Sequence, residues 1–343
     1  MAGWPGRRGP LPVAPRARAR SRSGRDRGAE RPDRNRRCTG PAGNRAGGRA
    51  RGSVIEEFAA AKLNLTLHVG PVRPDGYHPV DSLVVFADWG DRLTFEAADT
   101  LSLDITGEGA ETLRAEDGNL VLKAAETLAI AAGIDVPGAR IGLDKSIPLG
   151  AGLGGGSADA AAALRGLNRL WELDWPEDML AGLGAEIGSD VPACVFSRPL
   201  RMRGRGERTE MIETWPALPA LLVNPRQSVS TGRIFALYDI APRPIEAMET
   251  PVCETAEPAI GIASAGRNDL QPHAVAAAGV VGEVLKALEE LPAARLVRMT
   301  GSGSTCFALF DSKDAAAEAG HQMATSHADW LIQPVMLEGS DAA

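Results

Sequence analysis

The chain has 343 residues and a formal net charge of −7; 44% of the residues are hydrophobic and 4% aromatic, enough for one large or two medium domains with a buried core. Its four cysteines lie far apart and form no CxxC pair, which argues against a structural zinc site or a disulfide framework and favours a reducing, cytoplasmic location. The sequence contains no apolar run long enough to cross a bilayer.

The charge is unevenly distributed along the chain. Residues 1–52 contain 15 arginines and three acidic residues, so this segment carries +12 and the remainder carries −19. Residues 1–53 have few large apolar side chains and are expected to be disordered. We favour the interpretation that this segment is translated from DNA upstream of the true start codon and that the mature protein begins at Val54. The alternatives are an RNA-binding tail, an organelle transit peptide and a tail without function.

From Val54 onward, the hydrophobic pattern predicts strands and helices. Residues 59–69 alternate between polar and apolar side chains, as in a strand. Turn-forming residues follow at 73–79, and Trp89-Gly90-Asp91 predicts a second turn. The other elements expected in this part of the chain are strands at 82–87, 92–96, 101–105 and 139–147 and a helix at 119–132.

Helices predominate in the second half of the sequence. Apolar residues recur with helical spacing at 157–171, and a second helix is expected at 176–187. Residues 247–264 show little pattern and are expected to form a loop. The remaining predicted elements are strands at 220–223 and 330–337, helices at 231–238, 270–291 and 313–325, and a strand–turn–strand unit at 295–310. This distribution predicts an α+β protein in two lobes.

The most informative segment is a glycine-rich loop at 148–161, with the sequence PLGAGLGGGSADAA. Its spacing matches G-x-G-x-x-G, the dinucleotide-binding pattern, but that pattern requires a strand after the helix, and a second helix is expected here. A dehydrogenase is therefore disfavoured, and the lack of Gly-Lys-Ser/Thr disfavours a P-loop. A glycine-rich loop that opens a helix still presents free N–H groups to an anion, so phosphate binding is expected. Ser157 and Asp159 are candidates to cap this helix.

Three segments together resemble the motifs of the GHMP kinases, the superfamily of galactokinase, homoserine, mevalonate and phosphomevalonate kinases. AAKLNLTLHV at 60–69 is similar to the first motif, PLGAGLGGGS at 148–157 to the second and MTGSGSTCFAL at 299–309 to the third. The resemblance covers essentially the whole chain from Val54. It implies a lobe like ribosomal protein S5 domain 2 and a ferredoxin-like lobe, with the active site in the cleft between them. The lobes are expected at 54–212 and 213–343.

Two further segments, RPDGYHPVDSL at 73–83 and GSDVP at 188–192, are similar to one subgroup of these kinases. That subgroup phosphorylates the 2-hydroxyl of a cytidine diphosphate-linked methylerythritol in the non-mevalonate isoprenoid pathway. The resemblance implies that Asp190 is the catalytic carboxylate and Lys62 its cationic neighbour, which offsets charge on the transferring phosphoryl group. Without the resemblance, Asp190 would be interpreted as a helix N-cap before Pro192 and Lys62 as an exposed strand residue.

The same resemblance implies the remaining site residues. Asn64 is expected to contact the substrate, Tyr77 to stack on cytosine and His78 to hydrogen-bond along its edge, with Phe235 as the opposing aromatic ring. ATP is the expected cofactor and Mg²⁺ should accompany it, although no protein ligand for the metal can be identified. The residues expected to bind ATP are Pro148, Leu149, Gly150, Ala151, Gly152, Leu153, Gly154, Gly155, Gly156, Ser157 and Ala158.

Some assignments stay open at this point. Asn268 and Asp269 resemble an element of the family but also fit a helix cap, and Gly301 and Gly303 are expected to support the phosphate loop. Another GHMP kinase of the mevalonate or homoserine type is the nearest alternative function. A non-catalytic nucleotide- or RNA-binding protein is the alternative from a different class. The favoured interpretation expects small-molecule partners, without nucleic acid or membrane, and leaves the oligomeric state undetermined.

Overall fold

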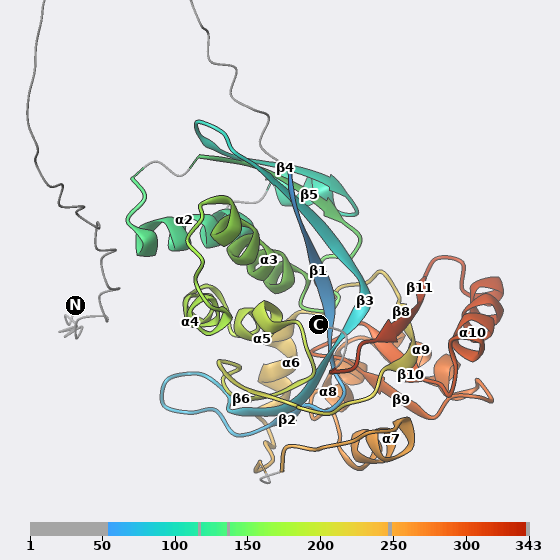
Figure 1. The fold of residues 1–343 in the computed structure, drawn as a ribbon. Helices are drawn as coiled ribbons and strands as arrows, with labels where there is room; N and C mark the ends of the chain where they lie inside the picture. Colours follow the sequence, from blue (N-terminus) through green and yellow to red (C-terminus); the bar gives the residue numbers. More distant parts are fainter. Residues whose placement is uncertain (1–53, 116–117, 136–137, 246–248, 341–343) are drawn as a thin grey trace, which may run out of the picture. The chain divides into compact units, whose positions relative to one another are not determined.

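The sheet is organised around one long strand, β3 (Val80–Glu96), which pairs with five other strands in the computed structural model (Figure 1). The structure describes residues 54–115, 118–135, 138–245 and 249–340. β4 (Leu101–Gly107) runs parallel to β5, and β7 (Arg208–Met211) pairs with β6. The five antiparallel partners of β3 are β1 (Ile55–Asn64), β2 (His68–Val69), β5 (Ala139–Lys145), β6 (Leu200–Gly204) and β11 (Leu331–Leu337).

Through β11 the sheet continues into the C-terminal part of the chain, in the order β11-β8-β10-β9. All seven residues of β8 are buried, because side chains cover both of its faces. Leu218, Ala220 and Leu222 pack with α7 on one face, whereas Leu221 and Val223 pack with α9 and α10 on the other. The elements are β8 (Leu218–Asn224), β9 (Leu296–Met299), β10 (Cys306–Leu309), α7 (Ala256–Ala265), α9 (Gly279–Glu289) and α10 (Lys313–Ser326).

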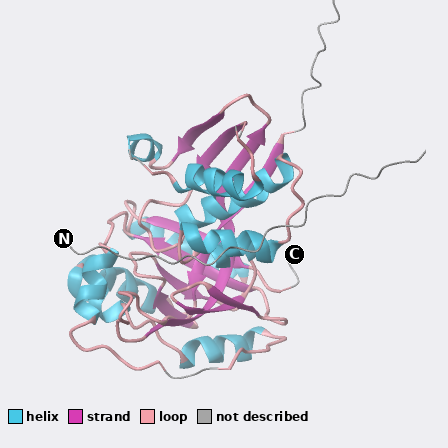
Figure 2. Ribbon diagram, turned by 90° about the vertical axis from the view of Figure 1, so that its left-hand side faces the viewer, coloured by secondary structure: helices cyan, strands magenta, loops and turns pink. Residues whose placement is uncertain are grey.

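Four helices that precede β6 in the chain form a layer against the strands (Figures 1 and 2). α3 packs directly on β1 and β3, and its small residues permit a close approach. A Cβ atom on Gly166 would lie 2.2 Å from the ring of Phe95. The packing of α3 fixes the position of its first turn, where the glycine-rich loop ends. The four helices are α2 (Leu120–Ala132), α3 (Gly155–Leu170), α4 (Glu177–Ile187) and α5 (Val191–Phe196).

Most predicted elements are confirmed, and the helices at 119–132, 157–171, 176–187, 231–238 and 313–325 agree with the structure to within two residues at each end. The remaining helices are α1 (Ala110–Ala115), α6 (Thr231–Tyr238) and α8 (Gln271–Ala277). None of the helices in the described ranges is long and apolar enough to span a membrane. The predicted segment 1–53 lies outside the described residues, and the lobe boundary after residue 212 stays a prediction.

The turn predicted at Trp89-Gly90-Asp91 is wrong, because β3 runs through these residues without interruption. Gly90 lies opposite Ala60 of β1. The two strands approach each other so closely here that a Cβ atom on Gly90 would lie 2.2 Å from the carbonyl oxygen of Ala59. The glycine therefore permits close pairing of the strands and does not reverse the chain.

Two predictions in the C-terminal half are also corrected. The segment predicted as a loop at 247–264 contains α7, which buries Ala259, Ile260 and Ala263 although its sequence has weak helical periodicity. Pro258 lies in the first turn of α7, where a helix tolerates proline. The helix predicted at 270–291 is interrupted at Ala278, whose extended backbone separates α8 from α9.

Candidate active site

A β-bulge in β1 sets the direction of Lys62 and Asn64. The register of β1 against β3 shifts between Ala60 and Lys62, and a bulge re-aims the side chains that follow it. Lys62 Nζ donates a hydrogen bond to Asn64 Oδ1 at 2.9 Å, and Asn64 Nδ2 donates to Ser82 Oγ of β3 at 2.7 Å. Lys62 is 3% exposed and Asn64 1%, so β1 holds both polar side chains in fixed positions.

Asp190 faces Lys62 from the start of α5. Its Oδ2 lies 3.2 Å from Lys62 Nζ, and its side chain is 35% exposed. Asp190 occupies the N-cap position of α5, but its side chain makes no capping hydrogen bond. Lys62 is not an exposed strand residue either. The structure therefore places an accessible carboxylate against a buried ammonium group, which is the pairing that the resemblance implied.

Cys194 lies one turn further along α5 and was not predicted to act in the site. Burial, with a further contribution from the negative charge of Asp190, raises the pKa of the Cys194 thiol to about 12. The thiol therefore stays protonated near neutral pH and does not supply a competing nucleophile.

The glycine-rich loop leads into α3 with open backbone donors. The N-cap residue is Gly154, which has φ +67° and no side chain to cap the helix, so the predicted caps are not used. The N–H groups of the first three helical residues have no acceptor within the helix. The first helical hydrogen bond is donated by Ala158 N to Gly154 O at 2.8 Å. Ala158, predicted to bind ATP, thus has its N–H engaged, and only 2% of its surface is exposed.

The other ten residues predicted to bind ATP, 148–157, all line one cavity of about 440 Å³. Lys62 connects this loop with Asp190. Its backbone N–H donates to Leu153 O at 2.9 Å, and a Cβ atom on Gly154 would lie 3.1 Å from Lys62 Cε. The lysine stem thus runs directly beneath the end of the loop, and its ammonium group lies between the loop and Asp190.

The turn between β9 and β10 supports the glycine-rich loop from the other side. Thr305 donates to Ala151 O from both its Oγ1, at 2.6 Å, and its N–H, at 3.1 Å. A Cβ atom on Gly301 would lie 2.7 Å from Gly152 O, and one on Gly152 would lie 2.6 Å from Gly303 O. Gly301 and Gly303 therefore support the glycine-rich loop through backbone contacts, as expected from the sequence.

Asn268 and Asp269 do more than cap a helix. Asn268 Oδ1 accepts from Leu270 N at 2.9 Å, while its Nδ2 donates to Met299 O at 2.7 Å and to Gly301 O at 2.9 Å. Asp269 accepts from Val69 N at 2.9 Å. This pair therefore ties the β9–β10 turn to β2, the strand at the end of the first motif.

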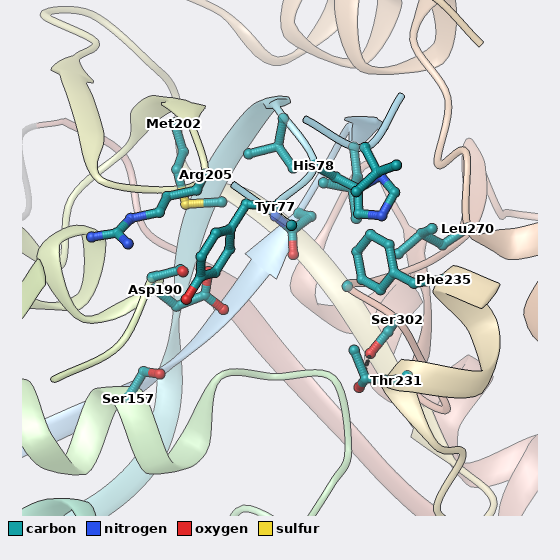
Figure 3. Close-up of a pocket in the computed structure, with 18 of the residues that line it drawn as sticks. Tyr77, His78, Ser157, Asp190, Met202, Arg205, Thr231, Phe235, Leu270 and Ser302 are labelled. Atoms are coloured by element: carbon teal, nitrogen blue, oxygen red, sulfur yellow. Dashed lines mark hydrogen bonds between the residues drawn. The ribbon is translucent and has the colours of Figure 1, made fainter. Parts of the chain in front are cut away.

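A second cavity, of about 650 Å³, opens beside Lys62 and Asp190 (Figure 3). Figure 3 shows Tyr77 and Arg205 on one side of it and His78, Phe235 and Leu270 on the other. The predicted residues that line this cavity are Lys62, Asn64, Tyr77, His78, Ser157, Asp190 and Phe235. The structure thus brings together all the predicted catalytic and substrate-contacting residues.

The aromatic residues of this cavity differ in their surroundings. The rings of His78 and Phe235 pack on each other, with centroids 4.7 Å apart and planes tilted by 31°. His78 Nδ1 lies 3.0 Å from Gly70 O, and its Nε2 lies 3.5 Å from Asp239 Oδ1. Tyr77 is 48% exposed, and the guanidinium of Arg205 lies 5.3 Å from its ring centroid. An accessible aromatic ring therefore faces the cavity from each side.

Five polar residues that line the same cavity were not predicted from the sequence, and one of them is Ser189, next to Asp190. Thr231 Oγ1 and Ser302 Oγ are 2.9 Å apart, and Arg205 and Asp239 complete the set. Ser302 lies inside the third motif and Thr231 begins a predicted helix, so the sequence contained a signal that could have identified both residues. Arg205 lies in the turn between β6 and β7, two strands that the hydrophobic pattern did not indicate.

A glycine-rich loop next to a lysine–carboxylate pair, on this α+β fold, defines a small-molecule kinase of the GHMP class. Family models agree: residues 119–198 match the GHMP kinases N terminal domain and residues 254–329 match GHMP kinases C terminal. A solved homoserine kinase from Cytophaga hutchinsonii is 18% identical, with a TM-score of 0.62 over 84% of this chain and 96% of that one. At that identity the likeness concerns the fold alone.

Relatives of higher sequence identity identify the family within the GHMP kinases. A 4-diphosphocytidyl-2-C-methyl-D-erythritol kinase from Cereibacter sphaeroides is 44% identical over 287 residues, which is 83% of this chain and 100% of the relative. A crystal structure of 4-(cytidine 5′-diphospho)-2C-methyl-D-erythritol kinase is 32% identical and has a TM-score of 0.66, over 83% of this chain and 100% of that one. The chain belongs to the 4-diphosphocytidyl-2-C-methyl-D-erythritol kinase family within the GHMP kinases.

Proposed function

We propose that this protein transfers the γ-phosphoryl group of ATP to the 2-hydroxyl of 4-diphosphocytidyl-2-C-methyl-D-erythritol, a step of the non-mevalonate isoprenoid pathway. The observation that carries the proposal is the position of the Lys62–Asp190 pair. The pair lines the cavity that contains Tyr77 and Phe235, and Ser157 lines both this cavity and the cavity of the glycine-rich loop. A donor bound in the cavity of the glycine-rich loop and an acceptor bound in the other cavity would meet at this pair.

In the proposed reaction, Asp190 accepts a hydrogen bond from the 2-hydroxyl and takes its proton as the oxygen attacks the γ-phosphorus. The new O–P bond forms as the bond to the bridging β–γ oxygen breaks, and ADP leaves with the electron pair. Lys62 stabilises the charge on the transferring group from its fixed position on β1. Asn64 holds the lysine ammonium and lines the acceptor cavity, so we assign it a substrate contact.

ATP would bind along residues 148–157, with its phosphates at the open N–H groups of the first turn of α3. An adjoining cavity of about 220 Å³ is large enough to admit part of the nucleoside. Its walls include the apolar side chains of Leu113, Leu120 and Leu149 and the polar side chains of Asn119, Lys145 and Asp159. Apolar walls with a few polar groups are typical of sites for a heterocyclic base.

The cytidine part of the acceptor would bind between the two aromatic sides of the larger cavity. Tyr77 offers an accessible ring for stacking, and Phe235 is the proposed ring on the opposite side. His78 would hydrogen-bond to the edge of the base, and its contact with Gly70 O fixes the ring orientation for that task.

Mg²⁺ is part of the same proposal. Within the described ranges, no three His, Cys, Asp or Glu side chains gather as a metal site. Mg²⁺ usually keeps several waters and binds through substrate phosphates with one or two carboxylates, so the ion would enter on the phosphates of ATP. We also propose a cytoplasmic location, supported by Cys194, Cys253 and Cys306, which are buried free thiols.

A coupled assay of ADP release tests this function directly. Release should require ATP, Mg²⁺ and the cytidine diphosphate-linked acceptor, whereas mevalonate or homoserine should not support it. Asp190→Asn should lower kcat by about 10²–10⁴-fold, the usual contribution of a general base, while the affinity for ADP stays within about threefold. Turnover of mevalonate or homoserine in place of the proposed acceptor would contradict the substrate assignment. Unchanged kcat in Asp190→Asn would remove that residue from the mechanism.

A further inference from the structure

Three buried charged residues lie beneath the glycine-rich loop and are not explained by the reaction. Lys145, the last residue of β5, donates from Nζ to Asp91 Oδ2 at 2.5 Å and to Asp159 Oδ2 at 2.7 Å. Their side chains are 2%, 0% and 5% exposed. They come from the sheet and from α3, so a single ammonium group connects the central strand, the strand before the loop and the helix after it.

The contacts of this network fall on both ends of the loop. Before the loop, Asp91 Oδ1 accepts from Ser146 N at 2.6 Å and from Ile147 N at 2.8 Å. After the loop, Asp159 lies in the second turn of α3 and binds the same lysine. A Cβ atom on Gly155 would lie 3.4 Å from Lys145 Nζ, so the ammonium group lies directly under the first helical residue.

Two carboxylates face the one ammonium group of this network. Burial opposes the charge on Lys145, but the two carboxylates outweigh it and raise the pKa of Lys145, which stays protonated. One carboxylate suffices to balance this charge, and burial raises the pKa of Asp159 to about 7. Asp159 Oδ1 also has no hydrogen-bond partner in the part of the chain that the structure describes. Asp159 thus contributes one acceptor oxygen, held at a fixed place on α3.

We propose that Asp91, Lys145 and Asp159 are positioning residues that hold the two ends of the glycine-rich loop in the spacing required for nucleotide binding. The inference rests on the proposed function in one respect, namely that the loop binds the phosphates of ATP. With the network intact, the N–H groups at the start of α3 already point toward one anion, so binding does not have to order the loop. None of the three residues needs to touch the reacting atoms for this effect.

Hydrogen bonding at the two carboxylates differs, and this provides a matched pair of isosteric variants. Asp91 accepts three hydrogen bonds with its two oxygens, so Asp91→Asn must turn its NH₂ group toward another donor. Asp159 accepts with Oδ2 alone, so Asp159→Asn can keep its oxygen on Lys145 and place its NH₂ where Oδ1 lacks a partner. Both changes replace a buried carboxyl group with a neutral amide of nearly the same shape.

The control is a third buried carboxylate of the same sheet. Asp81 on β3 pairs with Arg201 through two hydrogen bonds, and the two side chains are 5% and 3% exposed. Asp81→Asn also breaks a buried ion pair and is expected to lower stability. Since neither end of the glycine-rich loop contacts Asp81, the affinity for nucleotide should stay within about twofold.

The experiment measures the Kd of ADP by calorimetry, KM for ATP and for the acceptor, and hydrogen exchange of residues 146–158. Asp91→Asn should raise the Kd of ADP and KM for ATP at least tenfold and speed exchange in this segment, with KM for the acceptor unchanged. Asp159→Asn should change these values less than threefold, whereas Asp159→Ala should resemble Asp91→Asn. A wild-type protein that binds ADP but does not phosphorylate the acceptor would contradict the proposed function alone.

Two results would overturn the positioning role. One is a Kd of ADP within twofold of wild type in Asp91→Asn. The other is an equal loss of affinity in Asp81→Asn, which would show that general loss of stability is the cause. If Asp91→Asn does not fold, the comparison of Asp159→Asn with Asp159→Ala decides the same point, and equal ADP affinities in these two would contradict the proposal.

Discussion

Gly150 and Gly152 lie in the same loop and have similar backbone conformations, yet alanine should affect them very differently. Gly150 has φ +66° and Gly152 has φ +76°, so a side chain at either position pays for the left-handed conformation. That cost is about 1–2 kcal/mol for an alanine. At Gly150 the nearest atom to an added Cβ is Ser228 Cβ at 3.5 Å, which is ordinary contact. Gly150→Ala should therefore lower the free energy of unfolding by about 1–2 kcal/mol.

Gly152 has a second cost, because the β9–β10 turn lies against it. A Cβ atom there would come within 2.6 Å of Gly303 O and within 2.9 Å of Thr300 O. These are backbone atoms, so the turn itself must move, and overpacking of this kind adds about 1–3 kcal/mol. The movement would also strain the hydrogen bonds from Thr305 to Ala151 O. Gly152→Ala should lower the free energy of unfolding by about 2–5 kcal/mol in total.

Urea unfolding measures the difference between the two variants. Both midpoints should fall with unchanged m-values, and the fall for Gly152→Ala should exceed that for Gly150→Ala by at least about 1 kcal/mol after conversion to free energy. ADP affinity, measured on the same preparations, should be lower in Gly152→Ala. Equal destabilisation of the two variants would show that the β9–β10 turn does not press on the glycine-rich loop.

Three further outcomes are expected. Tyr77→Ala and Phe235→Ala should each raise KM for the acceptor about 5–150-fold and leave KM for ATP unchanged, because stacking on a base is worth about 1–3 kcal/mol; an equal change in both KM values would contradict this. Burial, and then the charge of Arg267, lower the pKa of His68, so the folded state favours its neutral form. Stability from this group is present above pH 6.5 and is lost as the pH falls toward the folded pKa, and urea midpoints from pH 7.5 to 5 should decline less in His68→Gln. Iodoacetamide at pH 8 should leave Cys194 unmodified in the native protein, as mass spectrometry of the peptides would show, because burial keeps the thiol protonated.

Local patterns were sufficient where a structure depends on neighbours in the sequence. The glycines before 157–171 indicated a loop that opens a helix, and α3 begins there. The motif resemblance led to Lys62 and Asp190, and the structure places these two residues 3.2 Å apart. The order of most strands and helices was also predictable, because amphipathic periodicity reflects which side of each element is buried.

Local patterns failed where a distant segment decides the outcome. Trp89-Gly90-Asp91 has the composition of a turn, but pairing with β1 holds it in a strand, and close approach to Ala59 explains the glycine. Weak periodicity at 247–264 concealed α7, which is held by packing on the sheet. Asp159 was interpreted as a cap because the sequence shows its position near a helix start. Its hydrogen bond with Lys145 depends on the packing of α3 on the sheet, which the sequence does not show.

The sequence by itself determined the class of chemistry: a glycine-rich phosphate loop, a lysine and a carboxylate, in an α+β chain that resembles the GHMP kinases. Only the tertiary structure decided how these parts act together. It directed Lys62 to Asp190 through a bulge in β1, placed Thr305 and the β9–β10 turn against the loop, and built the network of Asp91, Lys145 and Asp159 beneath it. Each of these contacts joins residues at least 14 positions apart, and such contacts arise from the pairing of strands and the packing of helices, which local sequence patterns do not encode.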